Sequence, residues 1–157
     1  AVHDLPELCL AAEFATPAAR EILKKANKEN PEQFTDLIKK TVMHPDVSHY
    51  LKMLIECDEN GLFFQGIPRI TPLMIAVGYN NTKAVEILID AAKKKGILEL
   101  YINMQCPPGT ATHDQAYAPD SEYSFYCVEG TTALHLASFS VYKADISILK
   151  RLLHEGA

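Results

Sequence analysis

The chain has 157 residues, of which 48% are hydrophobic, and its formal net charge is −5 at pH 7. This length suits one domain or one compact array with a substantial core. The negative charge gives no electrostatic reason to bind nucleic acid or an anionic membrane, and the sequence has no run of 18 apolar residues that would cross a bilayer.

The start of the chain and its cysteines bear on its location. The first residues, AVHDLPELCLAAEF, include no Met and lack the basic stretch of a signal peptide. We therefore expect a piece of a longer protein. The four cysteines, Cys9, Cys57, Cys106 and Cys127, form no C-x-x-C pair. In a chain with a good core, that pattern predicts unpaired thiols and a cytoplasmic location.

Three helices are predicted in the first third of the chain. The first begins at Thr16-Pro17, where threonine can cap the helix and proline suits its first turn. The second begins at residues 30–32 (Asn-Pro-Glu) and the third at residues 44–46 (His-Pro-Asp). Apolar residues at helical spacing follow each of these starts. The next stretch, CDENGLFFQG, is predicted to be a hairpin loop.

Four further helices are predicted, in two pairs. Residues 71–79 and 81–96 form one pair, and its second helix ends in a lysine run and Gly96, which suit a helix C-terminus. After a long gap, residues 131–139 and 145–157 form the other pair. Strand signals are weak, so the pattern predicts an all-α chain of short, paired helices.

One segment recurs 61 residues further along the chain. Residues 71–76 read TPLMIA and residues 132–137 read TALHLA, with Thr, Leu, an aliphatic residue and Ala at the same offsets. This pattern resembles the ankyrin repeat, which begins T-P-L-H-x-A-A and continues into a second helix and a hairpin. Weaker matches start at Pro6 and Thr35. Arg69 departs from the pattern, since the family usually has glycine there.

The resemblance implies an ankyrin-like solenoid of stacked helix-turn-helix repeats with hairpin loops. We expect one array with about four units, two of them degenerate, starting near residues 6, 35, 71 and 132. One such helix pair is too thin to bury its own apolar face, so neighbouring units must share a core. The aliphatic pairs Ile87-Leu88 and Leu152-Leu153 are predicted to form the buried stripes.

Within the repeated segment, His135 is the side chain that could take part in acid-base catalysis or metal binding. Its counterpart 61 residues earlier is Met74, and a residue that is replaced by methionine between copies is a poor candidate for acid-base chemistry. The resemblance implies that a histidine here hydrogen-bonds within and between repeats. We therefore predict a structural role, rather than a catalytic or metal-binding one.

The interval between the last two units contains an insertion, residues 106–129. It is rich in tyrosine and acidic residues, and no Lys or Arg occurs between residues 96 and 142. Two interpretations stay open: a contact loop on a rigid scaffold, or an insertion without a role, since long surface loops cost little entropy. Cys106, His113 and Cys127 match no zinc pattern. A disulfide is the alternative to unpaired thiols here.

Catalytic motifs are absent from the sequence. It contains no phosphate-binding loop, dinucleotide fingerprint, metalloprotease motif or nucleophile elbow. We predict no enzyme activity, no cofactor and no metal. The lysine clusters at residues 24–25, 39–40 and 93–95 are interpreted as solvated surface.

The leading hypothesis is a monomeric, non-catalytic module that binds a partner protein through its concave face and hairpin fingers. Positions that the family uses for contacts, together with exposed aromatic residues, give the candidate binding residues. These are Phe63, Phe64, Ile70, Tyr79, Tyr101, Tyr117, Tyr123, Tyr126, Thr131 and Phe139. For Phe63-Phe64, the alternative is a hydrophobic plug between irregular repeats.

A second hypothesis places the chemistry outside this chain. The chain would then be the targeting or regulatory ankyrin region of a larger protein, such as an enzyme or an effector that intracellular bacteria inject into the host-cell cytoplasm. This hypothesis depends on analogy with irregular ankyrin arrays.

Overall fold

The computed structural model describes residues 16–65, 70–106, 129–139 and 146–157. Every regular element that these residues form is a helix. In chain order they are α2 (Pro17–Glu29), α3 (Pro31–Met43), the 3₁₀ helix η1 (Pro45–Tyr50), α4 (Leu51–Glu56), the 3₁₀ helix η2 (Leu62–Phe64), α5 (Pro72–Gly78), α6 (Thr82–Lys94), α7 (Leu98–Ile102), α9 (Ala133–Phe139) and α10 (Ile146–His154). The predicted all-α fold is confirmed.

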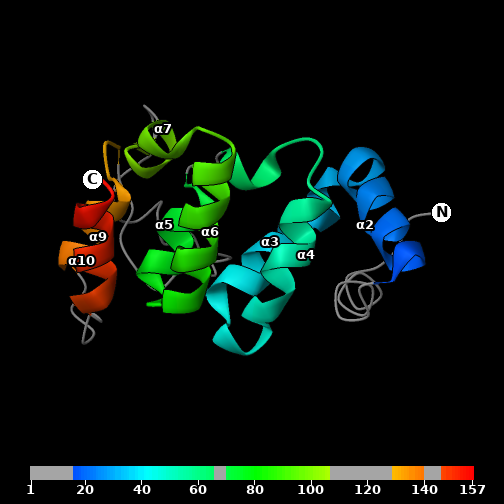
Figure 1. Cartoon of the computed structure of the whole chain (residues 1–157), viewed down its shortest axis with the longest axis horizontal. Coiled ribbons are helices and arrows are strands. Elements are labelled where there is room, and N and C mark those ends of the chain that lie inside the picture. The colour runs from blue at the N-terminus through cyan, green and yellow to red at the C-terminus, as the bar shows by residue number, and fades with distance from the viewer. Residues whose placement is uncertain (1–15, 66–69, 107–128, 140–145) are drawn as a thin grey trace.

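The helices stack in two layers. In the inner layer α3 packs against α5 and α5 against α9, whereas in the outer layer α4 packs against α6 and α6 against α10. Within each unit the two layers are joined by the contacts of α3 with η1 and α4, of α5 with α6, and of α9 with α10. Figure 1 shows the resulting row, which runs from α2 at one end to α9 and α10 at the other. This is the architecture of a helical solenoid.

Local side-chain caps explain why the helices begin where they do. Thr16 Oγ1 accepts a hydrogen bond from Ala19 N at 3.1 Å at the start of α2. Thr71 Oγ1 accepts one from Met74 N at 3.2 Å at the start of α5. Each threonine satisfies a backbone donor that the helix leaves without a partner, and a proline follows it in the first turn. The starts predicted from these Thr-Pro pairs are confirmed.

Two details differ from the sequence-based expectation. Thr35, taken as the start of the second unit, lies inside α3, which begins at Pro31 and runs for 13 residues. Leu153, predicted to be buried with Leu152, is 54% exposed, whereas Leu152 is fully buried. The reason is that α10 packs against α6 and α9, and no other described helix covers the face that carries Leu153.

The core is continuous across the units, and α5 lies at its centre. All six residues from Pro72 to Val77 are buried, because α3, α9 and α6 each pack against this short helix. A helix that is apolar on all sides belongs in an interior position. The inner layer therefore has no exposed side chain along most of α5.

A buried polar group joins the second unit to the third. Asn81, which is 2% exposed, accepts a hydrogen bond from Ala84 N at the start of α6. Its amide nitrogen donates to Val42 O at 3.1 Å and to Ser48 Oγ at 2.7 Å. One side chain thus caps a helix and satisfies polar atoms of the preceding unit, which fixes the register between the two units.

Candidate protein-interaction surface

The loop between α4 and α5 is held by a buried carboxylate. Asp58 is 4% exposed, and its two oxygens accept hydrogen bonds from Leu62 N, Phe63 N and the side-chain amide of Asn27, all within 2.9 Å. Asn27 in turn accepts a hydrogen bond from Asn60 N at 2.9 Å. The sequence suggested a hairpin here. The described part is instead a compact turn that the acid anchors to α2.

Four of the predicted contact residues lie in the core. Phe63, Phe64, Ile70 and Tyr101 are at most 8% exposed, so their side chains are not available to a partner in this structure. Phe64 and Tyr101 make an edge-to-face ring contact, with centroids 5.1 Å apart. For Phe63 and Phe64, the alternative interpretation as a hydrophobic plug describes what is observed.

Tyr101 is a structural residue with a specific partner. Its hydroxyl accepts a hydrogen bond from Leu73 N at 3.1 Å, so that α7 is tied to the first turn of α5. Burial raises the pKa of this phenol far above its usual value. The large apolar side chain that α7 presents to solvent is that of its neighbour, Leu100, which is 66% exposed. The sequence offered no signal to choose between these two adjacent residues.

The remaining predicted contact residues fall into two groups. Tyr79 and Thr131 are described and half-buried. The backbone of Phe139 ends α9, but its side chain lies outside the described residues, as do Tyr117, Tyr123 and Tyr126. The burial pattern therefore leaves Tyr79, Thr131 and Leu100 as the described candidates for contact.

The two ends of the insertion meet in a narrow neck. Cys106 N donates a hydrogen bond to Thr131 O at 2.9 Å, and Gly130 N donates one to Cys106 O at 3.0 Å. Cys106 is disulfide-bonded, and its partner lies outside the described residues. The expectation of an unpaired thiol is wrong for this residue, because chain folding, not sequence spacing, decides which thiols meet. The expected cytoplasmic location was inferred from reduced thiols, and a disulfide at Cys106 removes that argument.

His135 hydrogen-bonds at the start of its own helix. Its Nδ1 accepts a hydrogen bond from Thr132 N at 3.0 Å and lies 2.9 Å from Thr132 Oγ1. In return, Thr132 Oγ1 accepts one from His135 N at 3.3 Å. This reciprocal arrangement satisfies backbone donors as a capping box does. This is the hydrogen bonding within the repeat that the resemblance implied, whereas hydrogen bonding between repeats stays a prediction.

Charged side chains join the last two units on the outer layer. Glu155 Oε1 accepts hydrogen bonds from Lys93 Nζ at 2.6 Å and from Arg151 Nε at 3.0 Å, and Arg151 also binds Asp90 at 3.0 Å. The hydrogen bond from Lys93, supported by that from Arg151, lowers the pKa of Glu155. This cluster links α6 to α10.

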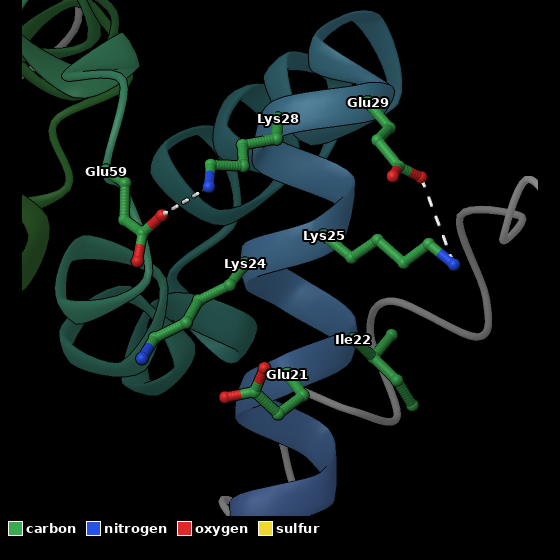
Figure 2. Close-up of a pocket in the computed structure, with 7 residues that line it drawn as sticks. All are labelled: Glu21, Ile22, Lys24, Lys25, Lys28, Glu29 and Glu59. Carbon is green, nitrogen blue, oxygen red and sulfur yellow. Dashed lines mark ion pairs between the residues drawn. The ribbon is translucent and has the colours of Figure 1, made fainter.

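Two of the hollows on the described part of the surface bear on binding. The first, of about 670 Å³, lies along α2 and is lined by three lysines, three glutamates and Ile22, with two ion pairs between the charged side chains (Figure 2). The second, of about 650 Å³, lies between α4 and α6. In the part of the chain that the structure describes, no group of His, Cys, Asp and Glu side chains is placed to hold a metal ion. No described helix is long and apolar enough to span a membrane.

Comparison with known families explains the repeated segment. The family model of the ankyrin repeat matches residues 69–98 and 129–157, which contain α5 with α6 and α9 with α10. These two segments are ankyrin repeats, and the chain folds as an all-α, ankyrin-like solenoid. No curated protein and no solved structure matches the chain. Ankyrin repeats are in general protein–protein interaction modules and are typically non-catalytic.

Proposed function

We propose that this chain is a non-catalytic module that binds a partner protein through the inner side of its stack and its connecting loops. The observation that carries the proposal is the packing of α5 against α9, which places two matched ankyrin repeats next to each other. Because α5 is buried from Pro72 to Val77, the proposed contacts lie just after α5, on α7 and before α9. The described contact residues are Tyr79, Leu100 and Thr131. Phe139 and the tyrosines of the insertion complete the proposed surface.

Leu100 strengthens this assignment. It is a large apolar side chain, 66% exposed, on a short helix whose next two residues, Tyr101 and Ile102, are anchored in the core. A rigidly held, exposed apolar residue is a good contact, because little conformational entropy is lost when it is covered. Tyr79 has the aromatic ring and the hydroxyl that interface centres favour.

Affinity enrichment with quantitative mass spectrometry tests the proposal. The tagged chain, a Tyr79→Ala/Leu100→Ser double variant and a Leu153→Ser variant are used to enrich partners from cells that contain the protein. Leu153→Ser is the matched control, since it also removes an exposed leucine, but from α10. We expect the double variant alone to lose its specific partners. Equal recovery by all three proteins would refute the contact surface.

A second candidate function is that of a regulatory or targeting region within a larger protein. The observation in its favour is the apolar face of α10, where Ile146 and Leu153 are 61% and 54% exposed. Such a face suits packing against a further structural unit. In the enrichment experiment, loss of partners with Leu153→Ser alone would favour this candidate. A location in the cytoplasm, of the cell itself or of a host cell, belongs to the same proposal.

A further inference from the structure

The hollow between α4 and α6 is a groove with an apolar floor. Ile55 of α4 and Ile87 and Ala91 of α6 line it, and all three are half-buried and packed against the core. Ile87, Ala91 and Lys94 are spaced four and three residues apart, so they share one face of α6. Their counterparts Lys52 and Ile55 are three residues apart on α4. Side chains from one face of each helix thus bound the groove.

Lysines dominate the rim of the groove. Lys52, Lys93, Lys94 and Lys95 line it, against two acids, Glu56 and Asp90. Both acids are neutralised by arginines that do not line the groove. Glu56 pairs with Arg20, and Asp90 pairs with Arg151 at 3.0 Å. The rim is therefore positive, on a chain whose net charge is −5.

The four lysines are not equivalent. Lys93 binds Glu155 at 2.6 Å, and the Lys95 ammonium lies 5.4 Å from the centroid of the Phe64 ring. Lys52 and Lys94 are exposed and make no ion pair with any described residue. These two lysines, one on each helix, are the cations open to a ligand.

The hollow along α2 provides a comparison for the hollow between α4 and α6. Three lysines and three glutamates line it, so the charges cancel, and Figure 2 shows Lys25 paired with Glu29 and Lys28 with Glu59. Ile22 is its one aliphatic side chain. The groove between α4 and α6 differs in both respects, since it has a net positive charge and three apolar residues on its floor.

We propose that this groove, the α4–α6 groove, docks an acidic amphipathic helix of a partner protein. Aliphatic side chains of that helix would cover Ile55, Ile87 and Ala91, and its carboxylates would lie against Lys52 and Lys94. The apolar floor favours a peptide with aliphatic side chains over the phosphates of a nucleic acid, which would leave that floor uncovered. The groove belongs to the outer layer of helices, so this site is separate from the inner contact surface proposed above.

Fluorescence anisotropy with a defined probe tests the site. The probe is a fluorescein-labelled peptide of about 14 residues, with leucines at helical spacing on one face and glutamates beside them. We expect saturable binding with a Kd on the order of 100 μM at low salt, weakening as salt is added. Lys52→Glu/Lys94→Glu should raise the Kd at least about tenfold, and Ile87→Ser about threefold. Lys52 and Lys94 are exposed and Ile87 is half-buried at the surface of the groove, so the circular dichroism spectrum should be unchanged.

The controls separate this groove from general attraction between charges. Lys24→Glu/Lys25→Glu makes the same charge change on α2 and should leave the Kd within about twofold of the original. A peptide with lysines in place of the glutamates should not bind. The proposal is overturned if both double variants weaken binding equally, if the peptide does not saturate, or if a single-stranded oligonucleotide of equal charge binds the groove as tightly.

Discussion

The repeats that begin at Thr71 and Thr132 share a motif but differ in their surroundings. In the first repeat, Thr71 caps α5 through Met74 N at 3.2 Å, and in the second, Thr132 accepts the equivalent bond from His135 N at 3.3 Å. Yet α5 is buried from Pro72 to Val77, whereas α9 leaves His135 exposed. The same threonine cap therefore starts both helices, whereas packing against the neighbouring units determines which of their side chains are buried.

The outer helices show the same contrast. Ile89 of α6 is fully buried, but Leu153 of α10 is 54% exposed. Their exposure differs because α6 lies between α4 and α10, so that helices cover it on both sides. In a stack with contacts between nearest neighbours, an interior unit has two interfaces to lose, and this difference can be measured.

The largest expected effect comes from truncating one leucine in each repeat. Leu73 and Leu134 hold the same place in the motif, two residues after the capping threonine, but Leu73 is fully buried and Leu134 is only half-buried. Leu73→Ala should lower the free energy of unfolding by about 3 kcal/mol, and Leu134→Ala by about 1 kcal/mol. Urea unfolding followed by circular dichroism measures both. Equal losses would mean that the two repeats are equally packed.

Removing the polar bridge between the second and third units should have the next largest effect. Asn81→Ala abolishes the cap of α6 and leaves Val42 O and Ser48 Oγ without its amide donor. We expect a loss of about 2 kcal/mol in the free energy of unfolding. Asn103→Ala is the control, because Asn103 is exposed and bonds only within its own turn, to Glu99 O. It should cost less than about 0.5 kcal/mol.

Exchanging the residues that differ within the motif should sharpen the comparison. His135→Met removes an exposed hydrogen bond that water can replace, so we expect a loss of at most about 0.5–1 kcal/mol. Met74→His places a polar ring where the side chain is 1% exposed, and it should cost at least about 2 kcal/mol. Urea unfolding again gives the values. A much larger loss of unfolding free energy with His135→Met would show that this histidine does more than cap its helix.

The smallest expected effect is a dependence on pH at the contact between the two repeats. Lys93 and Arg151 lower the pKa of Glu155 in the folded chain below its ordinary value of 4.5. The stabilisation is therefore fully present above about pH 4.5 and is lost as the pH falls through the lower, folded pKa. Glu155→Gln should reduce the urea midpoint at pH 7, and this difference from the original chain should shrink as the pH is lowered to about 3. A difference that does not change with pH would show that the carboxylate charge has no part in the contact.

Much of the helical framework was predictable because its causes are local. The Thr-Pro pairs at residues 16–17 and 71–72 start helices by capping donors within three residues, and the apolar spacing repeats with the helical period. The recurrence of the motif 61 residues later also revealed the stacked architecture, and it predicted a structural use for His135. The start of the second unit at Thr35 stays a prediction, and Thr35 lies inside a long helix that begins at an Asn-Pro pair rather than at the motif.

The candidate site was largely not predictable, because exposure depends on residues far apart in the chain. Residue type and position predicted that Phe64 and Tyr101 would contact a partner, but their side chains pack against each other in the core. Leu100, the residue before Tyr101, is exposed instead. From the sequence, the lysines at residues 93–95 were interpreted as solvated surface. The packing of α6 beside α4 places them and Lys52 around an apolar floor.

The sequence by itself thus determined where helices start and that the units repeat, since both depend on interactions within a few residues. Tertiary structure alone decided which side chains the units cover, which acid pairs with which arginine, and that Cys106 is bonded. These outcomes depend on contacts between residues that are tens of positions apart, and no local pattern in the chain encodes them.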